Sequence, residues 1–253
     1  MDGRPVMTAA LTDLTVDDSG VAVLTLRDER GKNALSMEMV AELEAGIELI
    51  RRRDDVRVLV LAGTENYFCT GANRAVLEAI AAGRVAPRDL LLPRLLLDIP
   101  VPVIAAMAGH AIGGGLAVAI CADITIAASE SRYGATFMQY GFTPGLGMTR
   151  LLEYVMGPPL AHELLLTGAT FRGSRFERHG AFTYVLPRAD VVEKARAIAA
   201  DLSGRPRRPL ALLKAALSRP KRELFEAART HESAMHEATF GTADVARLIQ
   251  QLE

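Results

Sequence analysis

Residues 105–122 read AAMAGHAIGGGLAVAICA, and the expected fold is organised around this stretch. The apolar run at residues 101–106 predicts a buried strand, and Gly113, Gly114 and Gly115 then lead into a helix of small residues. Three consecutive glycines at a helix start indicate that another group comes close to the backbone. Because the first N–H groups of a helix attract negative charge, we expect this turn to supply one arm of an oxyanion hole.

The segments around this stretch alternate between strand and helix patterns. Residues 21–27 and 56–62 predict strands, and between them an amphipathic helix begins after Ser36 and ends near residue 53. Such a unit closes with a right-handed crossover and a parallel strand pair, so we predict an α/β fold. Further strands are expected at residues 124–128 and 184–186. Helices are predicted at residues 159–167, 176–179, 189–202, 210–217 and 222–240, with Pro206, Pro209 and Pro220 between the later ones.

The composition narrows the class of protein. The 253 residues suit one large α/β domain, or one domain with a small appendage, and half of them are hydrophobic. A formal net charge of −1 argues against a general nucleic-acid binder, and we expect no membrane span. Residues 1–13 lack the layout of a signal peptide, and Cys69 and Cys121 form no CxxC motif. We therefore expect a cytoplasmic protein with reduced core thiols.

Three motifs carry a resemblance to a known superfamily: FCTGA at residues 68–72, AGHAIGGG at 108–115 and YGFTPGLG at 140–147. Together they resemble the enoyl-CoA hydratase/isomerase (crotonase) superfamily along nearly the whole chain. The resemblance implies a crotonase (ClpP-like) fold, with a superhelix of repeated ββα turns at residues 1–200 and a helical cap that helps trimers form at residues 201–253. It also implies a backbone oxyanion hole for a thioester carbonyl, made by the N–H groups of Ala72 and Gly114, and calls for no cofactor or metal.

Hydratases of this superfamily place two glutamates around the substrate double bond. The matching positions here are Ala117 and Phe137, and neither side chain can move a proton. General acid–base catalysis commonly contributes about 10²–10⁴ in rate, so we expect ordinary hydration of an enoyl thioester to be lost. The oxyanion hole is kept, whereas the usual acid–base pair is absent.

A narrower subgroup shows the same combination. Residues 137–145, 186–190 and 235–240 resemble the crotonase homologues of polyketide β-branching cassettes, most closely the second, decarboxylating enzyme. The resemblance implies a glutaconyl-type substrate held as a phosphopantetheine thioester on an acyl carrier protein, with a CoA thioester as the alternative. Loss of CO₂ leaves a dienolate, which needs an oxyanion hole and a proton donor but no water-activating glutamate. His236 matches the pocket histidine of the subgroup, and histidine can donate a proton near neutral pH.

One position departs from the subgroup. Its characterised decarboxylating members carry a lysine on the long loop; the matching position here falls near Ile80, and residues 73–97 contain no lysine. Arg84 is the best substitute for binding the leaving carboxylate, because a guanidinium pairs with a carboxylate in a bidentate fork. Arg74 is a second cation of this region that we assign to substrate binding. A substrate without a carboxylate, processed by dehydration or double-bond isomerisation, would need no such cation.

Residues 135–142 leave two interpretations open, because their aromatic and polar side chains suit either an acyl pocket or a subunit contact. We expect Tyr140 to be the pocket hydroxyl and Phe137 to lie beside the substrate. The resemblance therefore implies a lyase of polyketide β-branching that acts as a homotrimer on a carrier-bound thioester. The alternatives are a dehydratase or isomerase for a related thioester, and a catalytically silent trimeric scaffold.

Overall fold

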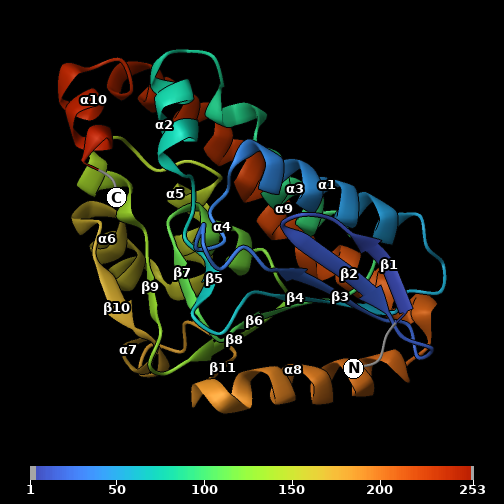
Figure 1. The fold of residues 1–253 in the computed structure, drawn as a ribbon. Helices are drawn as coiled ribbons and strands as arrows, with labels where there is room; N and C mark the ends of the chain where they lie inside the picture. Colours follow the sequence, from blue (N-terminus) through green and yellow to red (C-terminus); the bar gives the residue numbers. More distant parts are fainter. Residues whose placement is uncertain (1–3, 252–253) are drawn as a thin grey trace.

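The larger of two sheets runs through the middle of the molecule (Figure 1). The structure is a computed structural model that describes residues 4–251. Within them the larger sheet has the strand order β1-β2-β3-β4-β6-β8-β11; β1, β2 and β3 are antiparallel, and all later neighbours are parallel. Its strands are β1 (Arg4–Thr8), β2 (Thr12–Val16), β3 (Val21–Leu26), β4 (Val58–Ala62), β6 (Val103–Met107), β8 (Ile124–Ala128) and β11 (Tyr184–Leu186).

The smaller sheet has the order β10-β9-β7-β5, and three of its strands, β5, β7 and β9, follow directly on strands of the larger sheet. β4 leads into β5, β6 into β7 and β8 into β9, and a helix comes after each pair. This repeat of two strands and a helix confirms the predicted ββα fold. The strands are β5 (Tyr67–Cys69), β7 (His110–Ile112), β9 (Arg132–Gly134) and β10 (Thr170–Arg172); the helices after the three pairs are α2 (Arg74–Ala81), α4 (Gly114–Ile120) and the 3₁₀ turn η2 (Thr136–Tyr140).

Other helices cover both faces of the larger sheet. α1 begins where the sequence predicted, because the Ser36 hydroxyl accepts a hydrogen bond from the Met39 N–H at 3.0 Å. α8 lies across the outer face, with Val191 and Ala195 buried against β4, β6 and β8 (Figure 1). The remaining helices are α1 (Met37–Arg51), η1 (Pro87–Asp89), α3 (Leu92–Leu97), α5 (Met148–Met156), α6 (Pro158–Thr167), α7 (Gly173–Glu177), α8 (Arg188–Ser203), α9 (Arg207–Thr239) and α10 (Ala243–Gln250).

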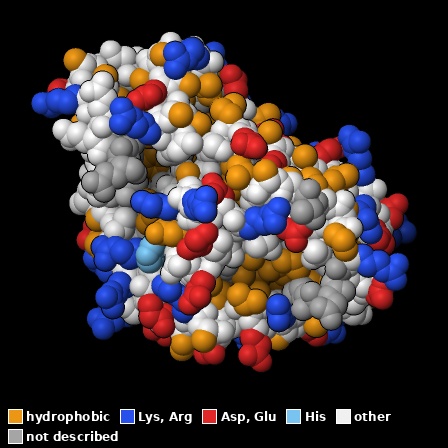
Figure 2. Space-filling model, viewed as in Figure 1, with side chains coloured by type: hydrophobic (Ala, Val, Ile, Leu, Met, Phe, Trp, Pro, Cys, Tyr) orange, Lys and Arg blue, Asp and Glu red, His pale blue; other side chains and the backbone are white. Residues whose placement is uncertain are grey.

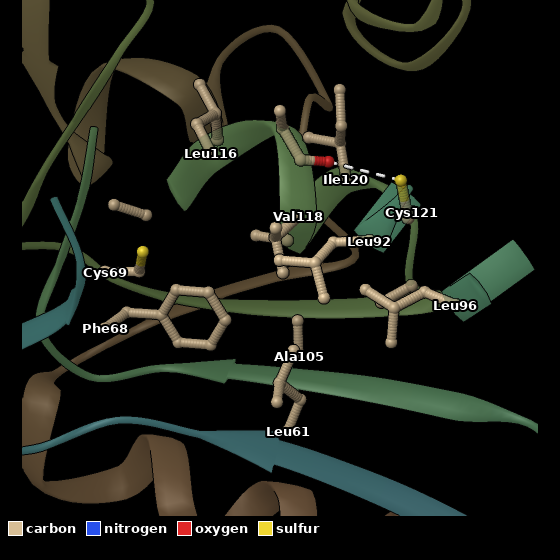
Figure 3. Close-up of a cluster of buried hydrophobic side chains, with 14 of the residues drawn as sticks. Leu61, Phe68, Cys69, Leu92, Leu96, Ala105, Leu116, Val118, Ile120 and Cys121 are labelled. Atoms are coloured by element: carbon tan, nitrogen blue, oxygen red, sulfur yellow. Dashed lines mark hydrogen bonds between the residues drawn. The ribbon is translucent and has the colours of Figure 1, made fainter. Parts of the chain in front are cut away.

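Helix α4 lies at the centre of the core, as the glycine-rich stretch predicted (Figure 3). A Cβ atom on Gly115 would lie 2.0 Å from the carbonyl oxygen of Cys69, so only glycine lets α4 come this close to β5. Cys69 and Cys121 are free and buried, and burial raises the pKa of each thiol to about 12. The prediction of two core thiols is confirmed.

The prediction of two separate helices at residues 210–217 and 222–240 is wrong. α9 is continuous and contains Pro220, although proline removes one helical hydrogen bond. Contacts to the end of α4 hold α9 in place on both sides of this residue. The Lys214 ammonium lies 2.8 Å from the Asp123 carboxylate, and the Lys221 ammonium donates to the Ala122 carbonyl at 2.7 Å. Tertiary contacts therefore outweigh the local effect of the proline.

The C-terminal helices pack back onto their own chain. α9 packs against α3 and α5, and α10 packs against α2 and η2 (Figure 1). Figure 2 shows Lys and Arg interspersed with Asp and Glu over one face, as a net charge near zero implies. Within residues 4–251, no helix is both long and apolar enough to cross a membrane. Helices α9 and α10 thus help enclose the centre of the fold, and the role of residues 201–253 in a trimer stays a prediction.

Candidate active site

Two glycine turns meet at one edge of the smaller sheet. β5 and β7 are parallel neighbours, so both strands end at the same edge, and each is followed by a glycine with a positive φ angle: Gly71 at 79° and Gly113 at 54°. The turns are in contact, because a Cβ atom on Gly71 would lie 2.9 Å from the backbone nitrogen of Gly114. The edge of the sheet therefore brings together the two segments that the sequence assigned to an oxyanion hole.

The N–H groups of Ala72 and Gly114 are available to a ligand. In the part of the chain that the structure describes, neither N–H donates a hydrogen bond to a protein acceptor. The N–H of Gly113 is already used, since it donates to the Gly134 carbonyl at 2.8 Å. An unpaired N–H is costly to bury unless a bound group accepts from it, so this pair is suited to a carbonyl oxygen that gains negative charge.

Both turns line a cavity of about 120 Å³. One buried water needs only about 10–15 Å³, so the cavity has room for a short branched acyl group. The polar side chains in its wall belong to Thr70, Thr136, Tyr140 and His236, and among the described residues no Asp, Glu, Lys or Arg lines it. The apolar part of the wall is formed by Leu35, Val76, Leu77, Ile80, Pro87, Leu90, Ile112, Phe137, Phe142, Leu146 and Phe240.

His236 lies on α9 in the wall of this cavity and is 7% exposed. Its Nε2 atom lies 3.0 Å from the Thr143 carbonyl oxygen, which can only accept, so Nε2 carries the proton and the neutral ring leaves Nδ1 unprotonated. Burial holds the pKa of His236 below its usual value, although the Thr143 carbonyl and the Glu232 charge oppose this shift. Burial thus favours the neutral ring, and Nδ1 is the atom that can take up a proton when an anion enters the cavity.

The aromatic segment around η2 is divided between the cavity and the core. Tyr140, Phe137 and Thr136 line the cavity, and burial raises the pKa of the Tyr140 hydroxyl. Tyr133 is fully buried elsewhere, where its hydroxyl donates to the Met107 carbonyl at 2.8 Å. The segment therefore contributes side chains to both the pocket and the packing.

The two arginines assigned to substrate binding lie outside the cavity wall. The Arg74 guanidinium is 2.8 Å from the Glu78 carboxylate and donates to the Gln250 carbonyl, so it ties α2 to α10. The Arg84 side chain is exposed on the loop after α2 and lines neither the cavity nor the hollow beside it. Neither arginine lines the cavity, and their assignment to substrate binding stays a prediction.

A third arginine of the same loop comes closer to the cavity than Arg84 does. A hollow of about 300 Å³ adjoins the cavity and shares Ile80, Pro87, His236 and Phe240 with it. Arg88 lines this hollow, with its guanidinium 3.9 Å from the Glu237 carboxylate. The sequence analysis did not select Arg88, since charge alone does not distinguish the arginines of one loop. The preceding residue, Pro87, was the available signal in the sequence, because proline fixes the backbone of a turn.

The positions of the two missing glutamates agree with an altered chemistry. Phe137 lines the cavity, with its ring edge-on to Phe142 at 6.1 Å between centroids. Ala117 is buried within α4 and brings no polar group to the wall. The site can therefore stabilise charge on a carbonyl oxygen and can exchange a proton through His236, but none of the described residues in its wall is a carboxylate that could activate water.

Comparisons with known proteins agree with this geometry. Residues 17–253 match the sequence pattern of the family Enoyl-CoA hydratase/isomerase. The chain is 38% identical over 246 residues to the bacillaene synthase decarboxylase PksI of Bacillus subtilis, a match that covers 97% of this chain and 99% of PksI.

Solved structures give the same result. One, described as part of a dehydratase/decarboxylase enzyme couple involved in polyketide β-branching, is 38% identical with a TM-score of 0.93 and 98% coverage of both chains. The ECH2 decarboxylase domain of CurF from Lyngbya majuscula is 34% identical with a TM-score of 0.88, over 96% of this chain and 99% of the other.

Proposed function

Because the chain belongs to the enoyl-CoA hydratase/isomerase family, we propose that it is a lyase that decarboxylates a glutaconyl-type thioester in polyketide β-branching. The substrate is held by the phosphopantetheine arm of an acyl carrier protein. Two relatives more than 30% identical over nearly the whole chain are named decarboxylases, which supports this assignment over hydration.

One observation carries the proposal: the cavity keeps two free N–H donors and has no carboxylate in its described wall. Hydration and dehydration both need a group that moves the proton of water, and general acid–base catalysis is commonly worth about 10²–10⁴ in rate. Decarboxylation needs only a group that stabilises the electron pair left when CO₂ departs, and a proton donor for the product. The site offers what decarboxylation needs, and its described wall lacks the carboxylate pair that the resemblance assigns to hydration.

The reaction can be followed through the residues of this chain. The bond from carbon to the carboxylate breaks, and its electron pair moves through the conjugated system to the thioester oxygen. The N–H groups of Ala72 and Gly114 stabilise that oxygen as it becomes negative, and each such donor is worth about 2.7–4 kcal/mol in comparable sites. His236, protonated at Nδ1 while the anionic substrate is bound, then gives a proton to carbon. CO₂ and a neutral enoyl thioester are released.

The substrate carboxylate starts close to apolar side chains. An apolar surrounding destabilises a carboxylate relative to a delocalised dienolate, which favours loss of CO₂. Arg88, on the rim of the adjoining hollow, is better placed than Arg84 to attract the carboxylate before it leaves. Tyr140 has a hydroxyl in the wall that can donate to the substrate.

A double-bond isomerase is the second candidate, and one observation favours it. No Lys or Arg among the described residues lines the cavity itself, so a substrate without a carboxylate would fit equally well. In that case His236 would take a proton from one carbon of the enoyl chain and return it to another. The free N–H pair argues against a catalytically silent scaffold, because a scaffold gains nothing from it.

We further propose a homotrimer that uses α9. Leu212, Leu213 and Leu217 are 66%, 56% and 61% exposed on the first half of this helix. Apolar side chains gathered in this way suit burial against a second copy. Sedimentation velocity should show a trimer, and Leu213→Glu should shift the protein toward monomer.

The experiment that separates the candidates uses a 3-methylglutaconyl thioester on an acyl carrier protein. After incubation, intact-protein mass spectrometry should show the loss of one CO₂. An unchanged mass with a moved double bond, detected by NMR of the released acyl group, would support the isomerase. Gain of water would contradict the proposal. The same acyl group on CoA tests the preference for a carrier protein.

A further inference from the structure

Glu232 of α9 is a buried carboxylate that lies beside the site without lining the cavity. It is 2% exposed, and its Oε2 accepts a hydrogen bond from the Gly147 N–H at 2.8 Å. Its Oε1 accepts from both the N–H and the hydroxyl of Thr149, at 3.0 and 2.8 Å. Because Gly147 is the residue before α5, a carboxylate from one helix satisfies the first N–H groups of another.

Glu232 and His236 hold the two ends of one loop. They are four residues apart on α9 and therefore face the same side of the helix. His236 donates to the carbonyl of Thr143, and Glu232 accepts from the N–H of Gly147. The loop fits closely between them, since a Cβ atom on Gly145 would lie 2.8 Å from Cε1 of His236.

Leu146, inside this loop, has an unfavourable backbone conformation. Its φ angle of 61° is rare for a bulky residue, and such a conformation persists only where the surroundings impose it. Its side chain lines the cavity and covers the oxyanion turn: a Cβ atom on Gly114 would lie 3.2 Å from Cδ1 of Leu146. The loop therefore links the Glu232 contact to the backbone that would receive the substrate oxygen.

We propose that Glu232 is a positioning residue that fixes loop 143–147 for the reaction. It acts by keeping Leu146 against the Gly114 turn and the His236 ring on the cavity wall, and it touches no substrate. The role of Glu232 in the reaction depends on the proposed function. Its contacts to the loop are present whichever reaction the site performs. Glutamine at this position has a single acceptor oxygen, so an NH₂ group would face one of the donors of Gly147 or Thr149.

Steady-state kinetics test this role on the full chain with the carrier-bound 3-methylglutaconyl thioester. Glu232→Gln should lower kcat by about tenfold or more while KM changes less than about threefold, because a misplaced site loses transition-state contacts before binding. Glu232→Asp should recover part of the rate. Glu223→Gln is the matched control, since Glu223 is exposed on the same helix and pairs with Arg219. An unchanged kcat in Glu232→Gln, with only a lower melting temperature, would overturn the proposal.

Two further measurements judge Glu232 even if the protein does not decarboxylate this substrate. Infrared spectroscopy of a bound butyryl carrier thioester, which has no carboxylate to lose, should show a lowered carbonyl stretching frequency in the wild type and at most half of that shift in Glu232→Gln. Amide hydrogen exchange should accelerate at residues 143–149 in that variant and stay unchanged in Glu223→Gln. Wild-type protection of this segment in Glu232→Gln would contradict the proposal, whatever the substrate.

A second variant covers the case in which Glu232→Gln does not fold. Thr149→Val removes only the hydroxyl donor to Oε1 and leaves the carboxylate in place. It should accelerate exchange in the same segment and lower kcat in the same direction, by less. A variant that folds, exchanges and turns over like the wild type would count against the loop contact.

Discussion

The cavity has two walls of different construction. The strand wall consists of the turns that hold Ala72 and Gly114, and it presents backbone N–H groups at the ends of two paired strands. The helix wall consists of His236 and Phe240 on α9, and it presents side chains. The geometry of the strand wall is fixed by the hydrogen bonds of a sheet. That of the helix wall depends on contacts between residues far apart in the chain, such as Thr143 and His236, which are 93 positions apart.

This difference separates two parts of the chemistry. In the proposed function, any thioester that gains charge on its oxygen uses the strand wall, whichever bond is broken. Of these two walls, the helix wall carries the imidazole of His236, which holds a proton in the proposed function, so we expect this wall to decide which reaction follows. Substitutions in the strand wall should therefore weaken every reaction of the site, and substitutions in the helix wall should change one step.

The largest effect is expected from removing the one titratable ring of the helix wall. His236→Ala should lower kcat by about 10²–10⁴, because the product would then take its proton from water. The fold should persist, as the ring's hydrogen bond to the Thr143 carbonyl is made to the neighbouring loop. Quench-flow with mass detection measures the rate. His162→Ala is the control, since His162 is exposed and pairs with Glu153; a His236→Ala enzyme as fast as wild type would remove His236 from the mechanism.

The strand wall is tested by Gly71→Ala. The added methyl would lie 2.8 Å from the Ile112 carbonyl oxygen and 2.9 Å from the Gly114 nitrogen, so the two turns would have to separate. We expect kcat/KM to fall by about 10²–10³, as when an oxyanion donor is lost. Gly83→Ala is a matched control: its φ angle is also positive, at 70°, but nothing lies within 4 Å of the added methyl. Equal losses in both variants would mean that backbone strain, not the oxyanion hole, is responsible.

The strand wall could be predicted from the sequence because its signals are local. Glycines that follow an apolar strand indicate a tight turn wherever they occur, and the structure places Gly71 and Gly113 in turns that touch. The ββα repeat also followed from the resemblance. The short strands β5, β7 and β9 are three residues each, too short for a hydrophobic period to show in the sequence.

The helix wall could be predicted only in part. The motif match led to His236, but the neighbours that set its proton affinity are distant in the chain, so neither the Thr143 carbonyl nor Glu232 was predicted as a partner. The continuity of α9 through Pro220 was missed because it depends on side-chain contacts to α4. The sequence interpretation favoured Arg84, whereas Arg88 lines the hollow, since a loop's path decides which of its arginines faces it.

A smaller effect is expected from substitutions of Arg84 and Arg88. Arg88 lies at the rim of the hollow beside the helix wall. Arg88→Ala should raise KM for the carboxylate-bearing substrate by up to about tenfold, because a charge-assisted contact at a half-exposed rim is weak. Arg84→Ala should leave KM within about twofold of the wild-type value, because the Arg84 side chain lines neither the cavity nor the adjoining hollow. Initial-rate measurements decide between them. A larger effect at Arg84 would restore the sequence interpretation.

The smallest expected effect is on the pH dependence of the free energy of unfolding. It also distinguishes the two walls, because the backbone N–H groups of the strand wall do not titrate, whereas the His236 ring of the helix wall does. Burial places the pKa of His236 below its ordinary value of about 6.5. Between those two pKa values the unfolded chain binds more protons than the folded one, so the free energy of unfolding falls as pH falls through this window. His110 shifts in the same direction and adds its own share. In urea unfolding at a series of pH values, His236→Gln should lose less stability than wild type on acidification below about pH 6.5, whereas Gly71→Ala should lose as much as wild type. Parallel curves for wild type and His236→Gln would show that the ring is not held neutral by the fold.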